Sequence, residues 1–196
     1  MEIFDDLPAI WDFFWQQLQK APHQKKHPWR TPVLASLDGD QVNQRTVVLR
    51  RVGQKERYLR FYTDFRSAKI RQKGEKLHFS WLFYNSSKQI QLRIKTEGAV
   101  VITEELEKIW QGLPVYARST YAATLPPGTA ITYPSDGLPD GFFNQSTPET
   151  DIFRENFAAV DNFITEIEFL QLHREGHRRG RWSWEENEWK GTWLIP

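Results

Sequence analysis

The chain has 196 residues, of which 39% are hydrophobic, so it can bury one sizeable core and we expect a single domain over residues 1–196. Its 26 basic and 25 acidic side chains leave a net charge of +1, a field too weak to favour nucleic acid or an anionic membrane as a partner. The absence of cysteine excludes disulfides, thiolate chemistry, iron–sulfur clusters and thiolate zinc sites.

The amino terminus, MEIFDDLPAIW, has acids where a secretory signal needs basic residues, and no run of about 18 uncharged apolar residues occurs. We therefore expect a cytoplasmic protein. The nine tryptophans and thirteen phenylalanines suit a barrel core, a subunit interface or a ring-stacking site, and composition does not choose among these.

The first predicted element is an amphipathic helix that ends at about Lys20. Apolar residues recur at helical spacing from Leu7 to Leu18, and the preceding Asp5 and Asp6 are suited to cap the helix start. We expect its apolar stripe to pack on the core.

Short strands follow from Thr31. The runs TPVLASL, QRTVVLRRV and RYLRFYT are separated by the turn signals DGDQ and GQKE, a pattern typical of antiparallel hairpins. A short helix that closes at Gly74 comes next. The runs LHFSWLFY and QIQLRIKTEGAVVI, joined by the turn NSSK, then bring the prediction to five or six strands by Ile102.

The remaining sequence predicts a helix, a long loop and further strands. TEELEKIW begins at Thr103 with acids in its first turn and predicts a helix to about Trp110. Residues 125–150 are rich in Pro, Gly and Thr without a period, which indicates a long loop. FAAVDNFITEIEFLQL reads as a strand, HREGHRRGR as a basic turn, and WSWEE and EWKGTWLIP as two last strands.

The octet YTDFRSAK, residues 62–69, places hydroxyl and cationic side chains between a strand and a short helix. Ser67 and the free N–H groups of a helix that starts near Arg66 would point at one spot, and Lys69 with Arg66 would add positive charge there. Such a spot binds phosphate. From the octet alone, a solvated basic helix that Asp64 or Ser67 caps is the commoner arrangement.

A strand pairing between QRTVVLRRV and RYLRFYT would strengthen the anion hypothesis. It would bring Arg45 and Arg50 near Thr63 and Ser67, so that polar groups converge on a dianion.

Two other polar groups stand out. Gln91, Arg93 and Lys95 share one face of QIQLRIKTEG, where an amide beside a guanidinium is suited to a flat heterocycle, although an ordinary half-exposed strand looks the same. HREGHRRGR is suited to RNA contact, to an anion clamp or to plain solvation. The two His-x-x-x-His spacings fall where Pro or Gly interrupts the chain, so we expect no metal site.

Five short motifs, in order and spacing, resemble the pyridoxamine 5′-phosphate oxidase-like family of FMN-binding split barrels. They are RTVVLR at 45–50, FYTDFRSAK at 61–69, SWLFY at 80–84, QLR at 91–93 with Gly98 after it, and Arg181 with WLIP at 193–196. The form with TD-x-RS-x-K and Q-x-R is similar to a divergent branch of that family. The resemblance implies a mainly β fold, an antiparallel split β-barrel with flanking helices, and a homodimer that holds two FMN molecules at the subunit interface.

The resemblance also implies which residues bind the cofactor. At the phosphate end, Arg45, Ser67 and Lys69 would hold the FMN phosphate, and Tyr62 and Thr63 would complete the pocket. At the ring end it implies the backbone of Thr46, Val47 and Val48 against the isoalloxazine, Arg50 near flavin and substrate, Gln91 or Arg93 on the ring, and Arg181 supplied across the dimer.

Three departures from the oxidase pattern bear on the substrate. Ala68 stands where the oxidase has a second basic residue, Leu170 where it has a flavin-contacting Trp, and the run from His177 to Arg181 lacks the His and Asp of its R-x-H-D-R turn. FMN binding is therefore better supported than oxidation of pyridoxamine phosphate. The hypotheses are an FMN-dependent oxidoreductase with a small anionic substrate and no assigned catalytic residue, a flavin-binding protein without turnover, and a non-flavin barrel that binds RNA.

Overall fold

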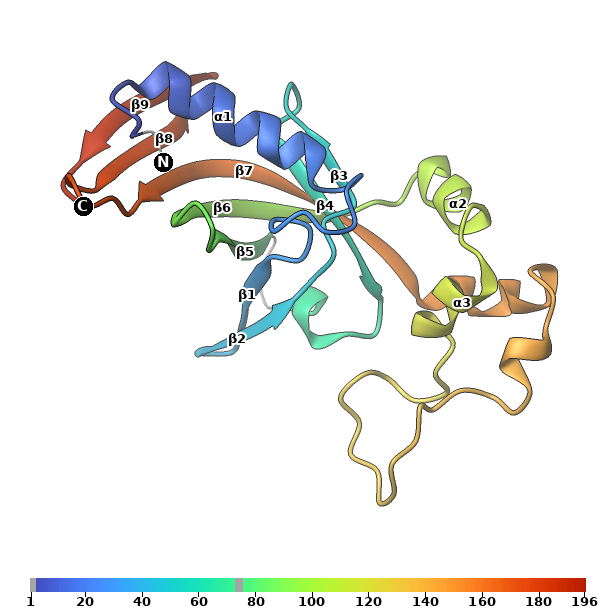
Figure 1. The fold of residues 1–196 in the computed structure, drawn as a ribbon. Helices are drawn as coiled ribbons and strands as arrows, with labels where there is room; N and C mark the ends of the chain where they lie inside the picture. The colour runs from blue at the N-terminus through green and yellow to red at the C-terminus, as the bar shows by residue number, and fades with distance from the viewer. Residues whose placement is uncertain (1–2, 73–75) are drawn as a thin grey trace.

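The computed structural model describes residues 3–72 and 76–196 and shows a bent antiparallel sheet with helices at its sides (Figure 1). The strands are β1 (Val33–Asp38), β2 (Gln41–Thr46), β3 (Arg51–Gly53), β4 (Tyr58–Asp64), β5 (Leu77–Asn85), β6 (Ile90–Val100), β7 (Phe157–Gln171), β8 (Arg178–Glu185) and β9 (Glu188–Leu194). Their order is β2-β1-β5-β6-β7-β4-β3, and β8 and β9 extend from β7. The sheet does not close on itself, and the mainly β class with flanking helices is confirmed.

Strand β7 organises the sheet because it has different partners along its length. From Val160 to Gln171 it pairs with β6; on the other edge its first half pairs with β4 and its second half with β8. The two groups of strands on either side of β7 are therefore joined by one continuous strand.

Helix α1 (Leu7–Lys20) lies along one face of the sheet (Figure 1), as predicted. The Asp6 carboxylate accepts a hydrogen bond from the Ala9 N–H at 2.8 Å and so caps the first turn. The helix buries Phe14 and Leu18 in the main core. Strand β5 contributes the predicted alternation to this core: Phe79, Trp81 and Phe83 are buried, with Leu77 packed at the edge.

A second apolar cluster lies under α2 (Glu104–Gln111) at the other end of the molecule. Thr103 caps α2 by accepting a hydrogen bond from the Glu105 N–H, which confirms the predicted helix start. Trp110 and Tyr121 are buried here against Phe157 at the start of β7. Short helical segments follow α2: α3 (Val115–Arg118), η2 (Ser119–Tyr121), η3 (Phe142–Asn144) and η4 (Pro148–Asn156).

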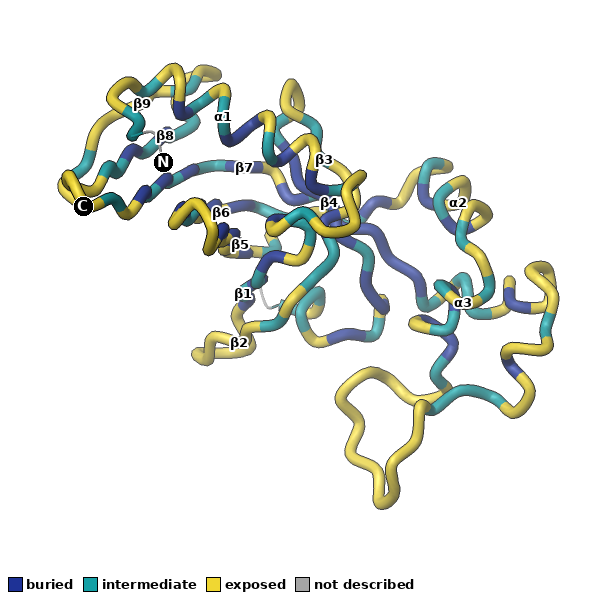
Figure 2. Tube along the Cα trace, in the orientation of Figure 1, coloured by how far each residue is buried: buried dark blue, intermediate teal, exposed yellow. Residues whose placement is uncertain are grey.

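The predicted loop 125–150 is irregular between Leu125 and Gly141, where it projects from the body and is almost entirely exposed (Figure 2). It is interrupted by η3 and the start of η4. In the described part of the chain, no helix is long and apolar enough to span a membrane.

The run QRTVVLRRV does not form the single predicted strand. Strand β2 ends at Thr46 and pairs with β1, whereas β3 begins at Arg51 and pairs with β4. Between them the chain crosses from one edge of the sheet to the other, and the crossing is fixed because Leu49 is fully buried and its N–H donates to the Arg30 carbonyl at 2.9 Å.

Two other predicted boundaries differ. The basic turn HREGHRRGR is shorter than predicted, because β8 already begins at Arg178 and pairs with Gln171. After β4 the structure has a 3-10 turn, η1 (Ala68–Ile70), and the predicted helix end at Gly74 lies outside the described residues.

Candidate functional site

A cavity of about 570 Å³ opens between the β2–β3 crossing, the end of β4 and the segment that follows α2. This volume is within the usual range for sites that take small molecules and cofactors. Eight of the predicted cofactor-binding residues line it: Arg45, Thr46, Val47, Val48, Arg50, Tyr62, Thr63 and Lys69. Ser67 joins them through a hydrogen bond from Lys69, so the chain brings most of the predicted site together in one place.

At one end of the cavity, the ammonium group of Lys69 contacts two hydroxyl groups. Lys69 Nζ donates to Thr63 Oγ1 at 2.8 Å and to Ser67 Oγ at 2.5 Å, and both hydroxyl residues are buried. Burial lowers the pKa of Lys69, the charge of Arg45 lowers it further, and Asp64 partly opposes them. Lys69 is therefore held next to a second cation and away from direct contact with a carboxylate.

Arg45 reaches this end from β2, where it pairs with Leu34 of β1 and not with β4. Its guanidinium donates to Ser36 Oγ at 2.5 Å and to the Asn43 carbonyl at 2.9 Å. Among the described residues, no carboxylate forms an ion pair with Arg45 or Lys69. The two cations do lie near each other. The predicted pairing of QRTVVLRRV with RYLRFYT is present only at its end, where Arg51 and Val52 pair with β4, so it is not what brings Arg45 to Lys69.

Arg66 does not add charge to the cavity. Its backbone N–H and its guanidinium donate to the Asp64 carboxylate at 2.7, 3.0 and 2.7 Å, and Nη2 also donates to the Ala123 carbonyl at 2.9 Å. The expectation that Arg66 adds positive charge beside Ser67 is corrected, because the buried Asp64 two residues earlier neutralises it.

The other end of the cavity is aromatic and carries one cation. The Arg50 guanidinium lies over the Tyr62 ring at 5.2 Å from its centroid. Tyr121 is 4% exposed, and burial raises its pKa to about 12, which keeps the phenol protonated at neutral pH.

The sequence did not lead us to predict the wall of the cavity that lies opposite the strands. It is formed by Leu113, Tyr116, Ala117, Thr120 and Tyr121. A short run of aromatic and hydroxyl residues directly after the second predicted helix, VYARSTY, was the available signal, but it has no clear period.

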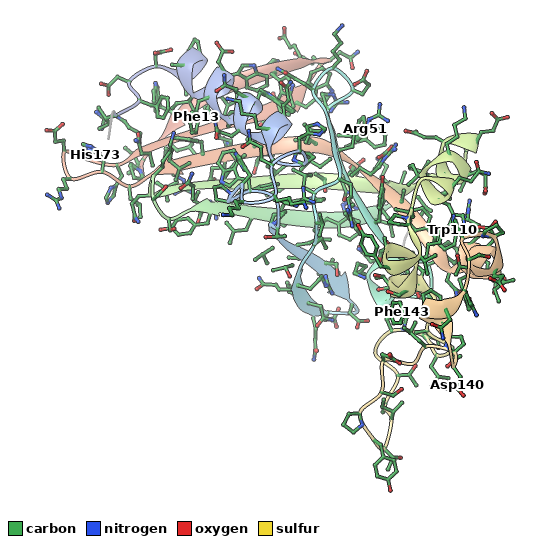
Figure 3. The ribbon with its side chains drawn as sticks, turned by 45° about the vertical axis from the view of Figure 1, so that its right-hand side comes forward. Phe13, Arg51, Trp110, Asp140, Phe143 and His173 are labelled. Atoms are coloured by element: carbon green, nitrogen blue, oxygen red, sulfur yellow. The ribbon has the colours of Figure 1, made fainter. Side chains whose placement is uncertain are left out.

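Arg118 fixes this wall although its own side chain does not line the cavity. It is 1% exposed and donates to the carbonyls of Trp110, Leu113 and Thr147 at 3.1, 3.0 and 2.7 Å. It also pairs with Asp151 at 2.6 Å and lies over the Trp110 ring at 4.4 Å. Figure 3 shows Trp110 at this end of the molecule, beside α2 and α3.

Gln91, Arg93 and Arg181 do not line this cavity. Arg93 forms an ion pair with Glu168 of β7, and Arg181 is the β8 partner of the same Glu168. Gln91 pairs with Leu170, two residues further along β7. The predicted residues therefore form two separate groups in the structure of the chain.

Comparison with known proteins finds one family that resembles the first half of the chain. Residues 10–103 match the model of the pyridoxamine 5′-phosphate oxidase FMN-binding domain. No curated protein matches the chain at a significant level. Residues 10–103, just under half of the chain, therefore resemble the FMN-binding domain of this family, and the cofactor that the matched family binds is FMN.

Solved structures support the fold. A pyridoxamine 5′-phosphate oxidase-related, FMN-binding protein from Nostoc punctiforme is 21% identical, with 98% of this chain and 100% of that chain covered and a TM-score of 0.75. PhzG from Burkholderia lata, in complex with tetrahydrophenazine-1-carboxylic acid, is 18% identical, with 98% and 94% covered and a TM-score of 0.70. The general stress FMN/FAD binding protein from Xanthomonas citri is 12% identical, with 85% and 92% covered and a TM-score of 0.51. The predicted split-barrel fold is thereby confirmed.

Proposed function

We propose that the cavity holds FMN with the phosphate between Arg45 and Lys69. The observation that carries this assignment is the end where two cations lie together with the Thr63 and Ser67 hydroxyls, and where no carboxylate of residues 3–72 or 76–196 pairs with either cation. A phosphate dianion would satisfy both charges and accept hydrogen bonds from the hydroxyls. The residues present therefore fit the phosphate group of FMN.

The ring of FMN would then extend along the β2–β3 crossing. Thr46, Val47 and Val48 line the cavity there, and their backbone is suited to contact a flat ring, with Tyr62 beside it. Arg50 lines the same end and would place a positive charge near the ring.

We further propose that the site is completed in a homodimer. Gln91, Arg93 and Arg181 form a separate group within the protomer, and the family resemblance predicts that Arg181 acts on the flavin of the other subunit. The same arrangement would bring Gln91 or Arg93 to the ring.

The activity that this site supports best is that of an FMN-dependent oxidoreductase whose substrate is not pyridoxamine phosphate. Bound FMN would supply the redox chemistry, as the acceptor of a hydride. This chain's residues would bind the phosphate, orient the ring and stabilise negative charge on the reduced flavin through Arg50. The departures between His177 and Arg181 support a substrate other than pyridoxamine phosphate.

A second candidate is a flavin-binding protein without turnover. Arg178 pairs with Asp5 at 2.8 Å and Arg179 with Glu168 at 3.1 Å, so two cations that stand in the place of the oxidase's substrate-reading turn are already neutralised within the protomer. These two ion pairs favour a protein that binds flavin but does not bind a substrate through this turn.

Two measurements test these proposals. The absorption spectrum of freshly purified protein, with the released cofactor identified after denaturation, tests FMN binding; a colourless protein that does not take up added FMN would refute it. Anaerobic mixing with candidate amines or NAD(P)H then separates the two candidates, because only an oxidoreductase reduces its bound flavin at a rate that supports turnover.

A further inference from the structure

Residues 125–141 form a loop, which we call the arm, that projects from the end of the molecule that carries α3 (Figure 1). The arm is closed near its base, because the N–H and the hydroxyl of Thr124 both donate to the Gly137 carbonyl, at 2.9 and 3.3 Å. Gly137 has a φ of +71°, a left-handed backbone conformation that glycine adopts without strain. The base of the arm therefore has a defined conformation, although no residue of the arm belongs to either apolar cluster.

The arm exposes apolar side chains and negative charge. Leu125 is 49% exposed, Ile131 52% and Tyr133 79%. A single exposed apolar side chain is ordinary, but three in one projecting segment indicate a surface that binds another molecule. The arm contains no basic residue, and its two acids, Asp136 and Asp140, are both exposed.

A second exposed surface lies on the outer face of β5 and β6. Leu82 and Tyr84 of β5 are exposed there and pair with Arg93 and Gln91 of β6. We call these four residues the outer strip. Because side chains alternate along a strand, the residues of β5 between them point into the main core, so the outer strip is on the solvent side of the sheet.

Positive charge borders the outer strip. Arg93 forms an ion pair with Glu168 of β7, and Lys95 forms one with Glu166. In both pairs the cation is the more exposed partner; for example, the side chain of Arg93 is 46% exposed and that of Glu168 is 11% exposed. The outer strip and the arm are therefore complementary, because both are apolar and their exposed charges have opposite signs.

The arm lies away from the outer strip of its own chain. In Figure 1 it projects away from β5 and β6, and the turned view of Figure 3 shows the same separation. A second copy of the chain can use both surfaces, because a two-fold pair places each arm on the outer strip of the other copy. Both surfaces also adjoin the proposed shared site: Pro127 of the arm lines the cavity, and the outer strip includes Gln91 and Arg93.

We propose that the arm of each subunit packs on the outer strip of the other subunit in the homodimer, with Ile131 and Tyr133 against the partner's Leu82 and the partner's Tyr84. Asp136 then faces the exposed cations that border the strip. Two-fold symmetry forms this contact twice in each dimer. The inference rests on the proposed homodimer and names the surfaces that hold it together.

The first test measures dissociation of the full-length, FMN-loaded dimer on dilution, by analytical ultracentrifugation. Tyr133→Ala and Leu82→Thr alter exposed side chains on the two surfaces. Each should raise the dissociation constant about 10-fold or more, because each removes two equivalent contacts per dimer. The double variant should weaken the dimer by less than the product of the two single effects, because the two residues contact each other. Ile102→Ala alters a more exposed apolar side chain outside both surfaces, and this control should leave the constant unchanged.

The second test uses the absence of cysteine from the chain. Tyr133→Cys, Leu82→Cys and Ile102→Cys each introduce a single thiol, and a short bis-maleimide joins two thiols that lie close together. After subunit exchange between mixed variants, the reagent should join Tyr133→Cys to Leu82→Cys and should not join Tyr133→Cys to Ile102→Cys.

The outcomes distinguish the inference from the homodimer on which it rests. If Tyr133→Ala and Leu82→Thr dimerise as tightly as the unaltered protein, the inference is wrong and the homodimer stands. Cross-linking of Tyr133→Cys to Ile102→Cys as efficient as that to Leu82→Cys would also overturn it. A protein that binds FMN but is monomeric at every concentration would overturn the homodimer and the inference together, and would leave the FMN assignment of the cavity in place.

Discussion

Arg66 donates three hydrogen bonds of 2.7 to 3.0 Å to the carboxylate of Asp64. Because this pair neutralises Arg66, Lys69 is the cation of the octet YTDFRSAK that lines the cavity. The second cation of the proposed phosphate site, Arg45, comes from a different strand. The proposed site thus combines a short segment after β4 with a hairpin strand from the opposite edge of the sheet.

Replacement of either cation should remove the flavin. We expect Lys69→Ala and Arg45→Ala each to weaken FMN binding about 10-fold or more, because each removes a charge-assisted hydrogen bond to the phosphate. The measurement is the ratio of flavin to protein absorbance after purification. Lys76→Ala, which alters an exposed lysine paired with Glu97, is the matched control and should stay yellow. Two fully yellow cavity variants would show that the phosphate assignment is wrong.

We expect the buried Lys69 to destabilise the apoprotein. The pKa of Lys69 is lower in the folded state than in the unfolded chain, so the unfolded state binds more protons at pH values between the two pKa values. The free energy of unfolding of the apoprotein should therefore increase as pH rises through that interval towards 10.5. Lys69→Met should remove this increase and raise stability at pH 8, although it abolishes flavin binding.

Urea unfolding of both apoproteins at several pH values measures this effect. A wild-type stability curve that stays parallel to that of Lys69→Met from pH 8 to above 10 would contradict the burial of a charged Lys69.

Glu105 should stabilise the fold above its own titration range. Its pKa is lowered, first by the hydrogen bond from Arg60, so its contribution is present above the unfolded value near 4.5 and is lost as pH falls through the folded value. We expect Glu105→Gln to be less stable than the unaltered protein at pH 7, and the difference to close in acid. Thermal unfolding from pH 7 to pH 3 measures it, with Glu104→Gln as the control. A difference that is independent of pH would show that the effect is not ionic.

Arg118→Met should destabilise the wall of the cavity by about 3 kcal/mol, because the carbonyls of Trp110, Leu113 and Thr147 lose a buried donor. Arg154→Met removes a more exposed arginine, paired with Glu107, and should cost less than about 1 kcal/mol. Urea unfolding compares the two variants. Equal costs would mean that the carbonyls find other partners, for example water.

Mixed dimers test whether each proposed site uses both subunits. Lys69→Ala and Arg181→Ala alter different groups, so a dimer with one variant of each kind would contain one doubly altered and one unaltered site. We expect each variant alone to bind FMN weakly and the purified mixed dimer to hold about half the flavin of the unaltered dimer. A mixed dimer as empty as its parents would contradict the shared site.

The sequence predicted those elements that local chemistry decides. The caps at Asp6 and Thr103 and the period-two burial of β5 follow from rules that act within a few residues. Eight of the predicted cofactor-binding residues also line one cavity. That they bind FMN, and that residues 1–196 form one domain, stay predictions.

Features that depend on distant partners were missed. The register of β2 is set by β1 across the tight turn at Gly39 and Asp40, so Arg45 approaches Lys69 by a route that strand propensity does not reveal. The pairing of Arg66 with Asp64 was missed because Asp64 is equally suited to cap a helix. The wall at 113–121 depends on the buried Arg118, a residue type that is usually exposed.

The pairing of β4 with β7 has a consequence for the order of folding. Arg60 and Asp161, joined at 2.6 Å, are 101 residues apart in the chain, and β4 also carries Tyr62 and Thr63 of the cavity. Contacts of such long range form slowly because a large loop must close first. During synthesis we therefore expect the cavity to be complete only after β7 has left the ribosome, and a nascent chain that stops before Phe157 should not retain FMN.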